Sequence, residues 1–245
     1  MRAPEGRLRA LATICFGSFV ISSFVVGLRL LAIAMRTGKT PELAIGAAFF
    51  AGGGFGYGLT VAAFAMGVFP ESLVPILILV GNTSASLGVV ALAFGTWRIF
   101  RPADHWPLLV IASVLIPLAL AIGGRLHDLA RVPAGPFVFW TFTTGSCLGY
   151  AWTGYESLRF HAMLRRRMRI GLASAELARR FLLWGIAASS AVGIHLCVAL
   201  NRLVEIDGMN PGLLLLQAIF GLAAAFGIWF AFFPPLRARR EATAA

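Results

Sequence analysis

The sequence predicts an all-α fold, a polytopic membrane protein built as one bundle of seven transmembrane helices. Two observations support this prediction. Hydrophobic residues make up 59% of the chain and charged residues only 13%, with a mean hydropathy of +0.84, whereas roughly 25% of the residues of a soluble domain are charged. Seven apolar stretches alternate with short polar breaks, and each has the ~20 residues that a helix needs to cross a bilayer.

The predicted spans cover residues 10–35, 42–65, 73–98, 106–123, 136–160, 180–200 and 211–233. The first follows a basic segment and is long, without a small-residue cleavage site, so we expect a retained helix. The others follow residues that begin or interrupt helices, in chain order Pro41, Pro70, Pro102, Pro136, Ser174 and Pro211. Because the spans use most of the chain, residues 1–245 are predicted to form a single transmembrane domain.

Lysine and arginine are divided unequally between the two sides of the predicted bundle. Fourteen lie on one side: Arg36, Lys39, Arg98, Arg101, Arg159, Arg165, Arg166, Arg167, Arg169, Arg179, Arg180, Arg237, Arg239 and Arg240. Six lie on the other: Arg2, Arg7, Arg9, Arg125, Arg131 and Arg202. Cytoplasmic loops carry the excess of basic residues, which places the N-terminus outside and the C-terminus in the cytoplasm of a plasma (inner) membrane.

The basic residues also indicate the expected partners. A formal net charge of +11 would suggest nucleic acid in a soluble protein, but here the arginines border apolar spans, so we expect no nucleic acid. We expect the lipid bilayer, with anionic lipids at the cytoplasmic face, as the partner. The densest cluster is Arg165, Arg166, Arg167 and Arg169. A docking surface for a cytoplasmic protein is the alternative role of this cluster.

Six polar side chains lie at similar predicted depths on five of the spans. With about 1.5 Å of rise per residue, they fall roughly 8 to 15 Å below the outer surface. They are Tyr57, Asn82, Thr83, Thr144, His195 and Gln217. If they converge, they line an outer polar pocket in which a small ligand binds. The alternative is that each hydrogen-bonds to a neighbouring helix and only stabilises the bundle.

Two charged residues lie within predicted spans near the inner boundary. The rise per residue puts Arg29 about 28 Å and Glu156 about 30 Å below the outer ends of their helices. A charge inside the membrane needs a partner or a route to the interface, so we predict an intramembrane pair between Arg29 and Glu156. Snorkelling of Arg29 to the interface, with a hydrated Glu156, is the alternative.

The second span is unusually rich in glycine. Gly52, Gly53, Gly54, Gly56 and Gly58 surround Tyr57. Missing side chains let another helix approach closely, and they also soften a helix enough to bend or unwind. Close packing and a functional hinge are therefore the two interpretations of this segment.

No residue pattern indicates an enzyme, a metal site or a bound cofactor. The three cysteines lie inside apolar spans, where a thiol behaves as a small hydrophobe. No two histidines lie plainly inside two spans, as a haem iron would require. The arrangement resembles that of rhodopsins and related receptors in topology alone, because the last span has no lysine for retinal.

We therefore expect a receptor-like or sensory membrane protein that binds a small ligand in the outer pocket. The first alternative is a small-solute transporter in which the glycine-rich second span moves. The second is an accessory or structural membrane subunit. A continuous polar path lined by Arg29 and Glu156 would favour the transporter over the receptor.

Overall fold

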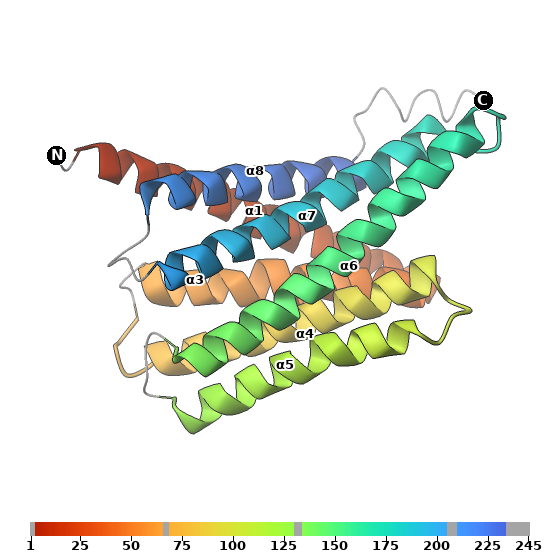
Figure 1. Cartoon of the computed structure of the whole chain (residues 1–245). Helices are drawn as coiled ribbons and strands as arrows, with labels where there is room; N and C mark the ends of the chain where they lie inside the picture. The colour runs from red at the N-terminus through yellow and green to blue at the C-terminus, as the bar shows by residue number, and fades with distance from the viewer. Residues whose placement is uncertain (1–2, 66–68, 130–133, 205–209, 234–245) are drawn as a thin grey trace.

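The computed structural model describes residues 3–65, 69–129, 134–204 and 210–233, and these residues form helices and turns without a strand. Figure 1 shows long helices that run alongside one another and alternate in direction. They are α1 (Ala3–Thr37), α2 (Thr40–Ala47), the π-helix η1 (Ala48–Gly56), α3 (Tyr57–Ala65), α4 (Val74–Phe100), α5 (Pro107–His127), α6 (Pro136–Met168), α7 (Ala175–Leu203) and α8 (Pro211–Phe232). The elements α2, η1 and α3 follow one another directly and make up the second predicted span.

Six helical segments of the described chain are long and apolar enough to cross a membrane: Thr13–Thr37, Thr40–Ala63, Val74–Phe100, Pro107–His127, Ala175–Leu203 and Pro211–Phe232. The chain is therefore an integral membrane protein by the length and composition of its helices. Helix α6, which contains the fifth predicted span, is long but is not among the six. Its threonines, serines, glycines and basic end make it more polar than the others.

The helices close into a ring. Helix α1 packs against α8 and η1, α8 packs against α7, and α7 against α6; α4 then connects α6 back to η1. Helix α5 contacts α4 and α6 and lies outside this ring. One end of the bundle holds the start of α1. We call the other end, where α4, α6 and α8 end, the arginine-rich end.

The hairpin of α6 and α7 reaches beyond the ends of α4 and α5 at the arginine-rich end (Figure 1). Ser174 caps the start of α7, because its side chain accepts a hydrogen bond from the backbone N–H of Leu177 at 3.2 Å. The predicted helix start at Ser174 is thus confirmed. His161 on α6 bonds through Nδ1 to the carbonyl oxygen of Ala178 at 2.7 Å, which joins the two arms of the hairpin.

Glycine allows η1 and α4 to touch backbone to backbone. A methyl group added to Gly88 on α4 would lie 2.4 Å from the Cα atom of Gly52, and one on Gly56 would lie 2.5 Å from the backbone nitrogen of Ala85. Both distances are shorter than any real contact, so these positions require glycine. The interpretation of the glycines as a close-packing surface is confirmed.

The same glycine-rich segment forms the π-helix. The backbone N–H of Tyr57 bonds to the carbonyl oxygen of Gly52, five residues earlier, where an α-helix would use the fourth. A wider turn leaves carbonyl groups in need of donors. Ser84 on α4 supplies one, since its hydroxyl donates to the carbonyl oxygen of Ala51 at 2.7 Å. Thr60 donates to the carbonyl oxygen of Gly56 at 2.9 Å.

Aromatic side chains fill the centre of the bundle toward the arginine-rich end. Trp184 lies between Phe181 and Phe232, with ring centroids 6.0 and 6.3 Å away, and Phe100 packs on both Trp184 and Phe160. Trp184 is 7% exposed. This cluster joins α4, α6, α7 and α8 near that end.

Candidate functional site

A cavity of about 400 Å³ lies within the half of the bundle that contains the start of α1. Its volume falls within the range of about 300 to 1,000 Å³ that is usual for small-molecule sites. Every one of the seven helical stretches supplies at least one wall residue. The wall consists of Phe16, Phe19, Tyr57, Thr60, Ile78, Asn82, Arg125, Ala134, Phe139, Phe142, Thr143, Tyr150, Ala191, Ile194, His195, Val198 and Gln217.

Tyr57 and His195 form a hydrogen bond in this wall. The Tyr57 hydroxyl lies 3.0 Å from Nε2 of His195, and Nδ1 of the same ring lies 2.8 Å from the carbonyl oxygen of Ala191. A carbonyl oxygen only accepts, so the proton of a neutral imidazole is assigned to Nδ1. Nε2 then accepts a hydrogen bond from the tyrosine. Both ring nitrogens are satisfied inside the protein, and the ring is held in one orientation.

Aromatic rings surround this pair. Tyr150 and Phe142, both on α6, place their ring centroids 5.7 and 6.4 Å from that of His195. On the other side, Phe16 and Phe19 of α1 meet the Tyr57 ring edge to face at 6.4 and 6.5 Å. Such a wall offers flat apolar surfaces on which an apolar or aromatic ligand packs.

Amides supply further polar groups to the wall. The Thr60 hydroxyl lies 3.4 Å from Oδ1 of Asn82, which joins α3 to α4. The side-chain oxygen of Gln217 is buried and has no hydrogen-bond partner within the described part of the chain. An acceptor in this position is available to a donor group of a ligand.

Arg125 places a positive charge in the wall. It lies near the end of α5, is only 2% exposed, and interacts electrostatically with Asp128, which is exposed. Arg125 also lines a neighbouring pocket of about 370 Å³ with Gly124, His127, Asp128, Gly135, Pro136, Phe137 and Val138. Arg125 therefore belongs to the walls of both spaces, the second pocket and the large cavity, which we call the aromatic cavity after its rings.

Arg125 was predicted only as one of the basic residues on the outer side, and its place in the cavity wall was not predicted. A signal was present: Val114, Leu118, Ala121 and Arg125 are the buried residues in the last four turns of α5, and they recur every three or four positions. That spacing marks one face of a helix. Because α5 is apolar on every face, the sequence did not distinguish its buried face from the others.

Four of the six predicted pocket residues meet in this cavity: Tyr57, Asn82, His195 and Gln217. Thr83 is half-buried and does not belong to the wall, and Thr144 is exposed. Thr143, its neighbour on α6, takes the place in the wall. Successive residues on an α-helix point about 100° apart, so a depth estimate does not tell adjacent residues apart. Ligand binding at these side chains remains a prediction.

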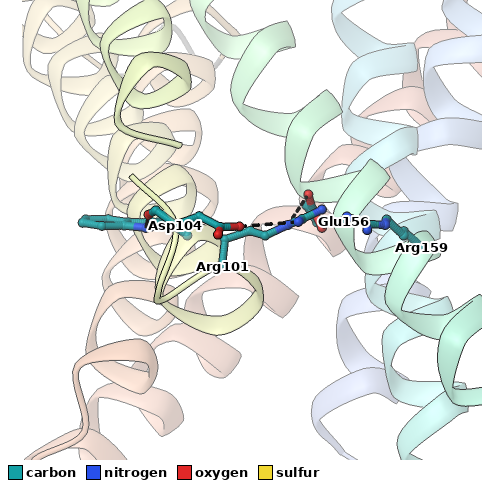
Figure 2. A network of polar contacts seen from close by, with 5 residues as sticks. Arg101, Asp104, Glu156 and Arg159 are labelled. Carbon is teal, nitrogen blue, oxygen red and sulfur yellow. Dashed lines mark hydrogen bonds and ion pairs between the residues drawn. The ribbon is translucent and has the colours of Figure 1, made fainter. Parts of the chain in front are cut away.

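A second group of polar residues connects α4 and α6 near the arginine-rich end (Figure 2). Arg101, just after α4, reaches across to Glu156 on α6, where its Nε lies 3.1 Å from Oε1. Arg159 approaches the other carboxylate oxygen at 3.7 Å, and Asp104 lies 3.5 Å from Nη1 of Arg101. The Glu156 side chain is only 4% exposed. Its negative charge is thus held between two arginines from different parts of the chain.

The predicted pair between Arg29 and Glu156 is wrong. Glu156 pairs with Arg101 and Arg159, whereas Nη1 of Arg29 donates to the carbonyl oxygen of Phe232 at 3.1 Å. Phe232 ends α8, and the last carbonyl groups of a helix have no partner within it. The Arg29 guanidinium also lies 4.3 Å from the centroid of the Phe233 ring. Arg29 therefore caps α8.

The predicted basic cluster lies at the end of α6. Arg165, Arg166, Arg167 and Arg169 are all exposed. The turn that follows exposes Ile170 and Leu172 by 69% and 73%. Arg180 on α7 pairs with Glu176. The tip of the hairpin is therefore positively charged, with two apolar side chains at its end.

Comparison of the chain with protein-family models, with curated proteins and with solved structures found no match.

Proposed function

We propose that the chain is a receptor-like or sensory membrane protein that binds a small, largely apolar ligand in the aromatic cavity. The observation that supports this proposal is the composition of the cavity wall. Seven helical stretches contribute to it, and a hydrogen-bonded pair, Tyr57 and His195, is fixed among aromatic rings. Ligand sites in helix bundles have this character, with apolar walls and a few oriented polar groups.

We further propose that α6 also crosses the membrane, which brings the number of transmembrane helices to seven. It packs against α4, α5 and α7. Several of its polar residues, including Thr143, Ser146 and Thr153, are buried inside the bundle. Polar side chains that face neighbouring helices lower the hydropathy of a span without exposing polar groups to lipid.

The proposed orientation has the N-terminus outside and the C-terminus in the cytoplasm of a plasma membrane, so that the cavity belongs to the outer half. The arginine-rich end then faces the cytoplasm, in keeping with the usual excess of positive charge there. A reporter that fluoresces only in the cytoplasm, fused to the C-terminus, tests this. A silent C-terminal fusion with a fluorescent N-terminal one would reverse the proposed orientation.

A ligand in the cavity would act on the hairpin of α6 and α7. Tyr150 and His195 lie in the wall, and their helices continue without a break into the exposed basic tip. Ligand contacts that favour one packing of α6 against α7 would therefore move the tip. In this proposal the tip contacts anionic lipids, with a cytoplasmic protein at Arg165, Arg166, Arg167 and Arg169 as the alternative.

A small-solute transporter is the second candidate, and a specific observation favours it. A smaller cavity of about 30 Å³ shares Phe19, Tyr150 and Ala191 with the large one, and extends along Phe49 and Gly53 of η1. Two adjoining cavities beside a π-helix are features that a transporter with a moving helical segment would use. Uptake of the bound compound into proteoliposomes would distinguish this function from sensing.

The test of ligand binding is native mass spectrometry of the protein purified from membranes. Ala191→Leu fills the cavity from its wall, whereas Leu196→Phe adds bulk on a side chain of α7 that is 52% exposed. We expect a small-molecule adduct on the wild type and on Leu196→Phe, and none on Ala191→Leu. His195→Ala and Asn82→Ala should weaken the adduct without lowering expression. If no variant changes an adduct, or the wild type carries none, the accessory or structural role becomes the better proposal.

A further inference from the structure

Arg125 is the one formally charged side chain among the described residues that line the aromatic cavity. At 2% exposure it has lost nearly all contact with solvent. Removing a guanidinium from water is costly, and its attraction for an opposite charge is strong where the dielectric is low. A ligand that brings a negative charge to this position would recover part of that cost.

Arginine can serve two anions at once. Its planar group carries five N–H donors, enough for a bidentate carboxylate and further contacts. It interacts with Asp128, which is exposed, and it also borders the cavity. The Asp128 carboxylate therefore does not preclude a second anion on the cavity side.

The neighbouring pocket supplies an independent observation. Arg125 belongs to the walls of both the aromatic cavity and the pocket that contains His127 and Asp128. It thus lies at the junction of the two spaces. The rest of the cavity offers apolar contacts from Phe16, Phe19 and Phe142.

We propose that the ligand is a small organic acid, with an apolar or aromatic body that packs among the phenylalanines and a carboxylate that pairs with Arg125. This inference rests on the proposed ligand site. The volume of about 400 Å³ fits a small molecule. A neutral molecule of the same shape would not form this ion pair.

The experiment uses two photo-crosslinking probes on the purified full-length protein: a ten-carbon carboxylic acid that carries a diazirine, and its primary amide. The two differ only in the charged group. Cross-linked positions are mapped by mass spectrometry over a range of probe concentrations. A charge-assisted hydrogen bond corresponds to a binding advantage of about tenfold to a hundredfold. We therefore expect the acid to label cavity residues at a concentration about tenfold to a hundredfold lower than the amide requires.

Variants locate the source of this preference. Arg125→Gln should abolish the advantage of the acid over the amide, and Arg125→Lys should retain part of it. Arg98→Gln is the matched control, because Arg98 is exposed near the end of α4 and does not belong to the cavity wall. This control should keep the full preference.

The outcomes separate the inference from the proposed function. Equal labelling of the cavity by acid and amide in the wild type would overturn the organic-acid ligand while supporting the site. A preference that survives in Arg125→Gln would do the same. Labelling that misses the cavity with both probes would overturn the proposed function and the inference with it. The wild-type comparison decides the matter even if Arg125→Gln does not fold.

Discussion

Tyr57 on α3 and His195 on α7 are 138 residues apart in the chain, yet the hydroxyl of the first lies 3.0 Å from Nε2 of the second. Each residue is held in addition by its own neighbours: Phe16 and Phe19 flank the tyrosine, and the carbonyl oxygen of Ala191 fixes the imidazole. The pair therefore connects two distant helices across the cavity and orients a polar group inside it.

Tyr57→Phe should lower the stability of the bundle by about 1 kcal/mol, the usual net value of one hydrogen bond. The ring and its aromatic contacts remain, and the change removes the hydroxyl that bonds to His195. Tyr155→Phe is the control, because that side chain is 61% exposed. Thermal unfolding in detergent measures both. Equal midpoints for the two variants would show that the bond contributes nothing to stability.

Arg101→Gln should destabilise the protein more than Glu156→Gln does. Removing the arginine leaves a carboxylate that is 4% exposed with a weaker partner, Arg159 at 3.7 Å. Breaking a buried pair costs about 3 to 5 kcal/mol, and we expect the lower end because Arg101 is 22% exposed. The double variant should be more stable than Arg101→Gln alone, which a double-mutant cycle in a reversible unfolding assay would measure.

The pair of Glu176 and Arg180 provides the control for that cycle. Both side chains are partly exposed, and exposed pairs contribute about 0 to 1 kcal/mol. Neutralising either one should change stability little. If neutralising this pair lowered stability as much as Arg101→Gln does, the effect of Arg101→Gln would be a general effect of changing charge at the arginine-rich end. It would then not report the loss of the buried contact with Glu156.

Gly88→Ala should disrupt the packing of α4 against η1. The new methyl group would lie 2.4 Å from Gly52, and forcing extra volume into a packed interface costs about 1 to 3 kcal/mol. Gly123→Ala on α5 meets nothing within 4 Å and should be neutral or stabilising, because alanine favours a helix over glycine by up to about 1 kcal/mol. Relative to the wild type, we expect the unfolding midpoint to fall in Gly88→Ala and to stay the same or rise in Gly123→Ala.

Ser84→Ala should loosen the π-helix. It removes the hydroxyl that donates to the carbonyl oxygen of Ala51 at 2.7 Å, so hydrogen exchange in peptides covering residues 48–56 should become faster. Ser113→Ala on α5 is the control. It removes a hydroxyl bonded to the Val110 carbonyl of its own helix at 2.7 Å, and should leave hydrogen exchange in residues 48–56 unchanged. Exchange as slow as in the wild type would assign the π-helix to its glycines alone.

The positions of the helices could be predicted from the sequence because hydropathy and helix-breaking residues determine them. The helices found cover all seven predicted stretches, and the all-α fold is confirmed for the described residues. Helix α6 extends beyond the predicted span, from Phe160 to Met168, through a segment that contains Arg165, Arg166 and Arg167. Charged residues with high helix propensity continue a helix into water.

The depth of the site residues could be predicted as well, but their direction around each helix could not. Tyr57, Asn82, His195 and Gln217 share a cavity because they lie at similar heights. Thr144 was chosen instead of its neighbour Thr143, because a helix in an apolar bundle gives no sign of which face is buried. The partner of a charged residue depends on that direction too.

The π-helix also changes the direction in which each side chain of the second span points around the helix axis. An α-helix turns by about 100° per residue, and a π-helix, with bonds to the fifth residue, turns by less. A helical wheel with a constant 3.6 residues per turn through 40–65 would therefore place Tyr57 and Thr60 on a face that they do not occupy. Loss or gain of one residue between Ala48 and Gly56 would rotate everything after it around the axis. The number of residues in this segment, as much as their identity, determines that Tyr57 faces His195.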